Sequence, residues 1–116
     1  MLNEYSIAIH GGAGAMSKGK LTPEQELEIT TILKEIVEDG LASLKEGASA
    51  LDVVQVAVNM LEDCSWFNAG KGAVFNHEGK HELDASIMCG KTLDAGAVSG
   101  IRFSPNPINV ARAVMD

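Results

Sequence analysis

The sequence is short of aromatic residues, which make up only 4% of its 116 positions. Aromatic side chains usually supply much of the buried area of a core, so Val, Ile, Leu, Ala and Met must fill this one. The total hydrophobic fraction of 46% is sufficient for a globular chain. The length corresponds to about one domain, so we expect a single globular unit with an aliphatic core.

Basic residues are also few. Lys and Arg number 9 against 16 Asp and Glu, which gives a formal net charge of −7. Nucleic acids and anionic membranes both attract basic surfaces, so the charge argues against either as a partner. No apolar run approaches the ~20 residues of a membrane-spanning helix.

Cysteine is nearly absent, with only Cys64 and Cys89 in the chain. Two cysteines in an ordinary core give no disulfide framework and are typical of free thiols in a reducing compartment. The first residues also lack the basic region and long apolar core of a signal peptide. We therefore expect a cytoplasmic protein.

Hydrophobic periodicity and turn residues divide the chain into six expected elements. We expect a strand, two helices, two strands and a helix, over residues 5–10, 22–47, 49–64, 83–89, 93–101 and 106–116 in that order. Thr22 and Gln25 can form a capping box around Pro23, and Asn106 can cap a helix that Pro107 opens. The second helix is apolar on nearly every face, which predicts burial between a sheet and another layer or subunit. This order of elements predicts an α/β fold.

A glycine-rich segment follows the first expected strand at residues 10–14 (HGGAG). Such a segment can present backbone N–H groups to an anion, although glycine turns after a first strand are also common in purely structural roles. The glycine spacing does not match the dinucleotide-binding fingerprint.

The five residues 77–81 (HEGKH) spell the zinc-protease motif, in which two histidines on one helical face hold the metal. Here the context is wrong, because Asn76 and Gly79 are turn residues and strand-like runs lie on both sides. We therefore interpret the segment as a solvent-exposed turn.

Asp84 and Asp94 stand near the starts of the two later strands. They could act as a pair of acids if the strand register brings them together. Hydrogen bonding to nearby turn backbone is the alternative that their positions favour.

Several motifs occur in order along the chain, namely residues 7–14 (IAIHGGAG), 68–72 (NAGKG), 81–85 (HELDA) and 95–98 (AGAV). Together they resemble the plant-type asparaginases, also called isoaspartyl peptidases, which are N-terminal-nucleophile hydrolases. The resemblance covers nearly the whole chain, and several ordered motifs are far more specific than any one alone.

The resemblance implies functional roles for two segments. Asn68 would reach the active-site region and help to position the nucleophile. The loop of His10, Gly11 and Gly12 would lie near the scissile bond of a precursor and assist its self-cleavage. From the residues alone, Asn68 can equally be a turn residue that tolerates unusual dihedral angles, so both interpretations stay open.

The resemblance also implies a structural sodium ion and no catalytic cofactor. The ion would be bound by the main-chain carbonyls of Leu61, Glu62, Cys64, Phe67, Ala69 and Lys71. Carbonyl ligation needs no particular side chain, so the residues themselves indicate only a compact loop that contains glycine. Lys71 departs from the family pattern, since a cationic side chain beside a cation must point outward.

In this family the nucleophile is the N-terminal threonine of a second chain, the β subunit, which self-cleavage of one precursor releases. The threonines at positions 22, 30, 31 and 92 do not stand in the glycine-preceded cleavage context of the family. The resemblance therefore implies that residues 1–116 are the N-terminal part of an α subunit, an incomplete piece of an αββα sandwich. It would be inactive alone and would hydrolyse asparagine and β-aspartyl peptides only with its β subunit, in a dimer of αβ units.

Two alternatives remain at this level. Glycosylasparaginases and threonine aspartases share the fold and the threonine chemistry; a secretory leader and disulfides would favour the first of these, and neither is visible. A stand-alone, non-catalytic binding domain is a different class, which a folded monomer of 12.2 kDa in solution would favour.

Overall fold

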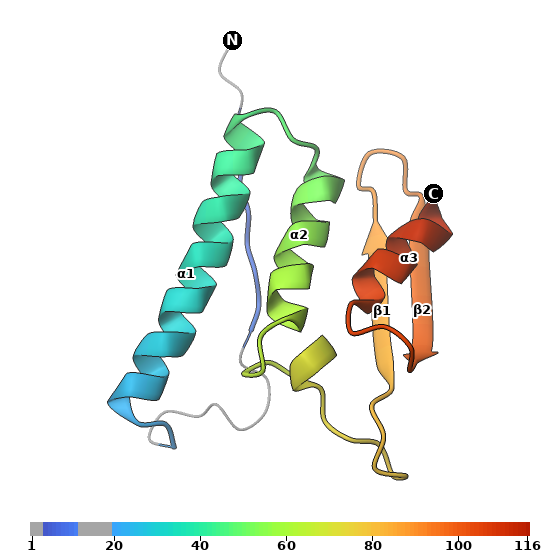
Figure 1. Ribbon diagram of the computed structural model, residues 1–116. Coiled ribbons are helices and arrows are strands. Elements are labelled where there is room, and N and C mark those ends of the chain that lie inside the picture. The colour runs from blue at the N-terminus through green and yellow to red at the C-terminus, as the bar shows by residue number, and fades with distance from the viewer. Residues whose placement is uncertain (1–3, 12–19) are drawn as a thin grey trace.

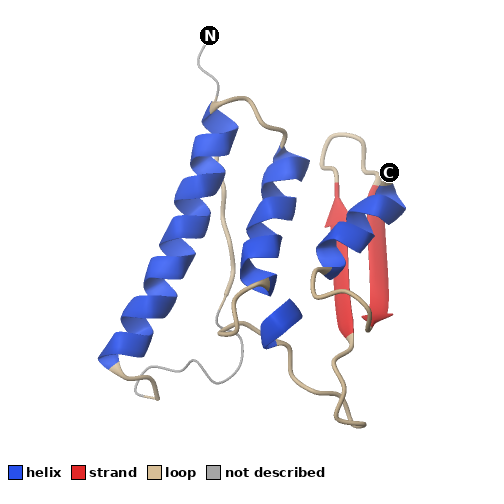
Figure 2. Ribbon diagram, viewed as in Figure 1, coloured by secondary structure: helices blue, strands red, loops and turns tan. Residues whose placement is uncertain are grey.

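The computed structural model describes residues 4–11 and 20–116. In this part of the chain the elements follow in the order α1 (Pro23–Lys45), α2 (Ala50–Glu62), the short 3-10 helix η1 (Gly70–Gly72), β1 (Leu83–Met88), β2 (Ala95–Ile101) and α3 (Pro107–Met115). Helices α1 and α2 lie side by side, and α3 covers one face of the β1–β2 hairpin (Figures 1 and 2). The arrangement confirms the α/β class.

The chain is flat and more extended than a compact domain of its length. Its extents are 48 × 34 × 17 Å and its radius of gyration is 15.5 Å, whereas the scaling for compact domains gives about 13 Å for this length. Helix α1 packs mainly against α2, and the hairpin packs mainly against α3. None of the helices described is both long and apolar enough to cross a membrane.

Helix α1 begins and ends at the predicted signals. The Oγ1 atom of Thr22 accepts a hydrogen bond from the Gln25 amide at 3.1 Å, and the Thr22 amide donates to Gln25 Oε1 at 2.9 Å. At the other end Gly47 has φ +96°, and the Ala48 amide donates to the Ser43 carbonyl at 3.0 Å. Glycine takes this left-handed conformation at little cost, so it closes the helix.

Helix α2 is less buried than its composition predicts. Val53 and Ala57 are buried, but Val54 and Val56 remain 40% and 47% exposed. The prediction of burial on most sides is therefore wrong for these two valines. The reason is that α1 and α3 flank α2 on two sides, and no further layer of the described chain covers the remaining face.

The segment predicted as a first strand, residues 5–10, forms no strand. It runs beside α1 (Figure 1), where Ile7 packs against Gly40 so closely that a Cβ on Gly40 would lie 2.5 Å from Ile7 Cδ1. A strand needs a neighbouring backbone with which to form ladder hydrogen bonds. The two described strands pair with each other instead, as a two-stranded sheet.

The hairpin confirms the two later strands, with shorter bounds. Met88 pairs with Ala95, and the connection is closed by hydrogen bonds from the Cys89 amide to the Asp94 carbonyl and from the Leu93 amide to the Cys89 carbonyl, both 2.8 Å. Leu93 has φ +66°, which lies outside the strand region. Strand β2 therefore begins after Leu93, at Ala95.

An irregularity interrupts the register at the other end of the hairpin. Leu83 pairs with Ile101 and Ala85 with Val98, so two steps along β1 face three along β2. The extra residue makes a bulge in which Gly100 adopts φ +63°.

One cluster of core residues lies between the hairpin and α3. Ile87, Ile108 and Ala111 are buried together. Gly96 of β2 lies directly beneath α3, where a Cβ would collide with the Ala111 carbonyl and come within 2.6 Å of the Met115 amide nitrogen. The close approach of strand and helix therefore depends on a small residue, as the composition of these strands suggests.

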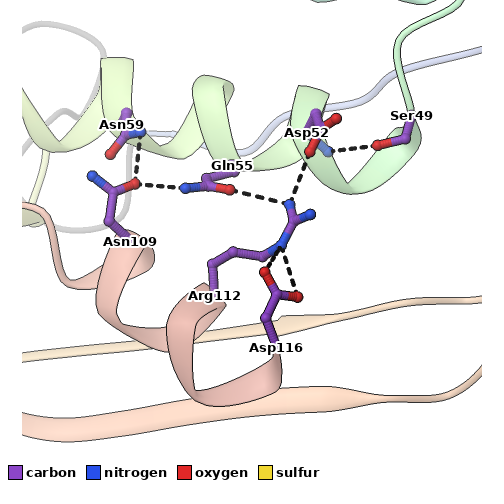
Figure 3. Close-up of polar contacts among 7 residues, drawn as sticks. All are labelled: Ser49, Asp52, Gln55, Asn59, Asn109, Arg112 and Asp116. Atoms are coloured by element: carbon purple, nitrogen blue, oxygen red, sulfur yellow. Dashed lines mark hydrogen bonds and ion pairs between the residues drawn. The ribbon is translucent and has the colours of Figure 1, made fainter.

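A polar network joins α2 to α3 along their exposed side (Figure 3). It consists of Ser49, Asp52, Gln55 and Asn59 from α2 and its cap, and Asn109, Arg112 and Asp116 from α3 and its end. The Arg112 guanidinium is central, because Nη1 donates to Asp52 at 3.0 Å and to Gln55 at 3.1 Å. The network fixes how α3 lies against α2.

We expect this network to respond to acid through Asp52. The Ser49 hydroxyl and the Arg112 guanidinium hold the pKa of Asp52 below its ordinary value of 3.8. A lowered folded pKa stabilises the folded state above the ordinary value, and this contribution is lost as the pH falls through the folded pKa. In urea unfolding of the full-length protein, Asp52→Asn should therefore be less stable than the wild type at neutral pH, and the difference should shrink below pH 3.8. Asp39→Asn on α1 is the matched control, and a difference for Asp52→Asn that does not depend on pH would contradict the assignment.

Candidate functional site

A cavity of about 330 Å³ opens between the end of α2, the loop that follows it and strand β1. Its walls include Glu62 from α2, Asn68 and Gly70 from the loop, and Ser86 from β1. Small-molecule sites usually have volumes of this order and a few convergent polar groups. The cavity is therefore the candidate site.

Asn68, which the sequence singles out, lies in the wall of this cavity. Its Oδ1 atom accepts a hydrogen bond from the Val74 amide at 3.0 Å, so the side chain has a structural contact within the loop. Its Nδ2 group donates to no partner among the described residues and lies in a side chain that lines the cavity. The structural and functional interpretations are thus compatible, because each uses a different atom of the same side chain.

The N-terminal glycine segment meets the same loop. Gly11 packs against Phe67 and Leu33, so that a Cβ on Gly11 would lie 2.7 Å from Phe67 Cε1. His10 is exposed, and Gly12 falls outside the described residues. The structure therefore brings Gly11 and the loop together, although they are more than fifty residues apart in the sequence.

Hydrogen bonds within its own backbone hold the loop after α2 in a compact shape. The Cys64 amide donates to the Leu61 carbonyl at 3.2 Å, and the Ala69 amide donates to the Phe67 carbonyl at 2.8 Å. The Gly72 amide donates to the Ala69 carbonyl at 3.0 Å. Each of these carbonyls accepts one such bond and has a second lone pair left.

Two carbonyl oxygens of the loop, those of Phe67 and Ser65, approach Gly72 closely. A Cβ on Gly72 would collide with the Phe67 carbonyl oxygen and lie 2.7 Å from that of Ser65. Hard cations such as alkali ions prefer neutral and anionic oxygen ligands. The donor set of the loop therefore fits the ion that the resemblance implies.

Glu62 is the charged side chain that the described core buries, with 2% of its surface exposed. Its Oε2 atom accepts a hydrogen bond from the Ile108 amide at 3.2 Å, and its Oε1 atom accepts one from Asn106 Nδ2 at 3.3 Å. Burial raises the pKa of Glu62, and the bonds from Ile108 and Asn106 oppose that rise.

Helix α3 begins at Pro107 after Asn106, as predicted, but the predicted capping by the Asn106 side chain is wrong. Asn106 does not cap the helix with its own side chain, because its amide group donates to Glu62 and, at 3.0 Å, to Asp63 Oδ1. Glu62 caps α3 from another helix instead, since the Ile108 amide is one of the free N–H groups of the first turn. Sequence reasoning missed this role because the carboxylate comes from 46 positions earlier in the chain.

Among the other candidate side chains, Asp84 lines the cavity, whereas His77, Glu78 and His81 of the zinc-protease motif do not. Residues 77–79 form a turn rather than a helix, which confirms the predicted turn, and the ring of His81 stacks on Phe75 with centroids 4.5 Å apart. Across residues 4–11 and 20–116, no three His, Cys, Asp or Glu side chains gather as a metal site.

Asp84 and Asp94 lie at opposite ends of the hairpin and do not pair. Asp84 Oδ1 accepts a hydrogen bond from the Gly100 amide at 3.0 Å, in the bulge of β2. This confirms backbone hydrogen bonding for Asp84.

Cys64 and Cys89 are free thiols, and hydrogen bonds from Thr92 and Lys91 lower the pKa of Cys89 in the hairpin turn.

Comparison with known proteins identifies relatives of this chain. Residues 3–116 match the family model described as Asparaginase. The chain is 52% identical over 115 residues to the isoaspartyl peptidase of Salmonella typhimurium, which covers 99% of this chain and 37% of that protein. It is 54% identical over 110 residues to the isoaspartyl peptidase of Escherichia coli, covering 95% of this chain and 34% of that protein.

An archaeal relative gives the same result. The chain is 51% identical over 111 residues to the plant-type L-asparaginase of Pyrococcus furiosus, covering 96% of this chain and 35% of that protein. The chain thus spans about a third of the length of the curated relatives that it matches.

Proposed function

The chain belongs to the asparaginase family whose model matches residues 3–116, and from this premise we propose that it is the N-terminal part of a hydrolase. The hydrolase cleaves the side-chain amide of L-asparagine and the β-aspartyl bond of isoaspartyl peptides. The observation that carries the proposal is identity of about half to relatives named isoaspartyl peptidase and plant-type L-asparaginase, over almost the whole of this chain. The same names do not favour a glycosylasparaginase, a threonine aspartase or a stand-alone binding domain.

The proposed fold of the complete protein is an αββα sandwich of the N-terminal-nucleophile type. In it the hairpin and α3 form part of one sheet and one helix layer. Two features support a larger assembly: the relatives are about three times as long, and the radius of gyration of 15.5 Å exceeds that of a compact domain. The partner that completes the sandwich is a β subunit from the same precursor, and two αβ units form a dimer in the cytoplasm.

The proposed mechanism places the nucleophile on the β subunit. The hydroxyl of its N-terminal threonine attacks the amide carbonyl of the substrate. The free α-amino group of the same threonine takes the proton, because a hydroxyl is a weak nucleophile at neutral pH. It passes the proton to the leaving nitrogen as the C–N bond breaks, and water then hydrolyses the threonine ester and releases aspartate. The residues of this chain bind and orient rather than react.

Asn68 is the residue of this chain that we assign to the site. Its Oδ1 atom is occupied by the Val74 amide, which fixes the side chain, and its Nδ2 group can donate into the cavity. A hydrogen-bond donor that is already held in place lowers the reaction barrier most where negative charge develops in the transition state. The neighbouring Gly11 segment supports the same loop from the other side through Phe67.

We also propose that the loop holds a sodium ion through the carbonyls of Leu61, Glu62, Cys64, Phe67, Ala69 and Lys71. The support is that the carbonyl oxygens of two of these residues lie close to glycines of the loop, that of Phe67 beside Gly72 and that of Glu62 beside Gly70. The bound ion supplies a fixed positive charge that orders these carbonyls. Lys71 is exposed, so its side chain can point into solvent as a ligand of this kind requires.

The decisive experiment uses the full-length protein. It should be purified, its components weighed by intact mass and sequenced from their N-termini, and its activity assayed with L-asparagine and β-aspartyl dipeptides. We expect two polypeptides, one of them beginning with threonine, and release of aspartate from both substrates. A single uncleaved chain without hydrolysis would refute the proposed function.

Substitution of Asn68 separates its two roles. We expect Asn68→Ala to lower kcat about 10- to 100-fold, because a misplaced or absent positioning group costs rate of this order. Asn68→Asp keeps an oxygen for the Val74 amide but removes the donor, so it should be nearly as slow. Asn76→Ala is the matched control, because Asn76 holds a turn outside the cavity by accepting from Glu78 and Lys80. Full activity of Asn68→Asp would restrict Asn68 to a turn role.

A further inference from the structure

The Glu62 side chain sits where three parts of the chain converge. Its backbone ends α2, its carboxylate accepts the Ile108 amide of α3, and its surface lines the cavity beside Asn68. A buried carboxylate is costly unless donors meet it. Two donors do so here, from Ile108 at 3.2 Å and Asn106 at 3.3 Å.

The loop after α2 passes between the end of α2 and the start of α3, which the hydrogen bond from Ile108 to Glu62 holds together. Gly70 lies between the backbone of Glu62 and the segment before α3. A Cβ on Gly70 would be 2.5 Å from the Pro105 carbonyl oxygen and 2.6 Å from that of Glu62. The bonds from Glu62 to the start of α3 therefore act as a clasp around Gly70.

We propose that Glu62 is a positioning residue that sets the placement of Asn68. Its carboxylate holds the start of α3 against the end of α2, which closes the backbone around Gly70 and fixes Asn68 two residues earlier. This role rests on the proposed function of Asn68. It assigns the side chain of Glu62 a task separate from that of its main-chain carbonyl.

A carboxylate suits this task better than an apolar residue. The first turn of a helix has N–H groups with no partner in the helix, and α3 forms no cap bond with the side chain of Asn106. A carboxylate has two oxygens, so it can accept from the Ile108 amide and the Asn106 side chain together. An apolar side chain of the same volume would leave the Ile108 amide unsatisfied and Asn106 with Asp63 as its acceptor.

The variants for the test are made in the full-length protein. Glu62→Ala removes the clasp. Glu62→Gln keeps the side-chain volume and one acceptor oxygen. It provides the test of the proposal if the Glu62→Ala variant does not fold. Arg112→Gln is the control, because it weakens the other connection of α2 to α3, through Asp52 and Gln55, and leaves Glu62 in place.

The first measurement is hydrogen exchange of the loop amides, Val74 above all, since its amide donates to Asn68 Oδ1. We expect Glu62→Ala to accelerate this exchange about tenfold or more, and Glu62→Gln by less, because local opening exposes these amides. Arg112→Gln should leave Val74 exchange unchanged even where it lowers overall stability. Unchanged Val74 exchange in both Glu62 variants, or equal acceleration in Arg112→Gln, would overturn the proposal.

The second measurement is steady-state hydrolysis of a β-aspartyl dipeptide. For Glu62→Ala we expect kcat to fall about tenfold with KM within about twofold, because a misplaced positioning group acts on the transition state. Glu62→Gln should recover part of that loss. A kcat equal to that of the wild type would overturn the role in placing Asn68. If the wild type itself does not hydrolyse the dipeptide, the proposed function fails, while the exchange comparison still decides whether Glu62 holds the loop.

Discussion

Replacing Gly70 by alanine is expected to cost about 3 kcal/mol or more of unfolding free energy, because two separate penalties add. Gly70 has φ +47°, and a left-handed conformation costs an alanine about 1–2 kcal/mol. The new Cβ would also lie 2.5 and 2.6 Å from the carbonyl oxygens of Pro105 and Glu62. Backbone atoms cannot rotate away as a side chain can, so α3 or the loop must shift.

That shift should also abolish most turnover, because Gly70 is two residues from Asn68 and lies inside the clasp formed by Glu62. Urea unfolding and kcat of the full-length protein measure both effects. Gly79→Ala is the matched control: Gly79 has φ +75°, but a Cβ there would meet no described atom within 4 Å. It should therefore show the conformational cost alone, with normal kcat. Equal losses in the two variants would mean that the close contacts around Gly70 do not matter.

The sequence predicts the elements whose signals are local. Thr22 and Gln25 are three residues apart and cap α1 as predicted, and the hairpin strands are confirmed within two residues at each end. The strand predicted at residues 5–10 is wrong, because its alternating pattern reports exposure of side chains, whereas a strand also requires a distant backbone partner. Exposure of Val54 and Val56 has the same kind of cause, since it depends on which layers lie beside α2.

In the candidate site, too, features with a local signal could be predicted from the sequence, whereas features that depend on distant contacts could not. The family motif locates Asn68, and the structure places it in a cavity wall. The carboxylate of Glu62 was not predictable, because an acidic residue at the end of a helix is ordinarily exposed. Its burial arises only when α3 packs 46 residues later. Asn106 illustrates the converse: a good local cap is redirected to Glu62 and Asp63 because a tertiary partner competes for its side chain.

Replacing Gly96 by alanine is the second substitution with a large expected effect. Gly96 lies in the ladder of β2, paired with Ile87, directly under α3. An added Cβ would collide with the Ala111 carbonyl and lie 2.6 Å from the Met115 amide nitrogen. Overpacking of a close-packed core costs about 1–3 kcal/mol and occasionally more. We expect about 3 kcal/mol here, because the atoms that must move belong to the backbone of α3.

The effect of Gly96→Ala should reach the site through α3. Ala111 lies in the same helix as Ile108, whose amide binds Glu62, so lifting α3 from the hairpin would also loosen the clasp around Gly70. We therefore expect Gly96→Ala to accelerate exchange of the Val74 amide as well as to lower the urea midpoint. Gly90→Ala in the same hairpin is the matched control, since a Cβ there would meet no described atom within 4 Å. A Gly96→Ala protein as stable as Gly90→Ala would show that α3 does not rest on β2 in the full-length protein, and the placement of Glu62 above the cavity would fail with it.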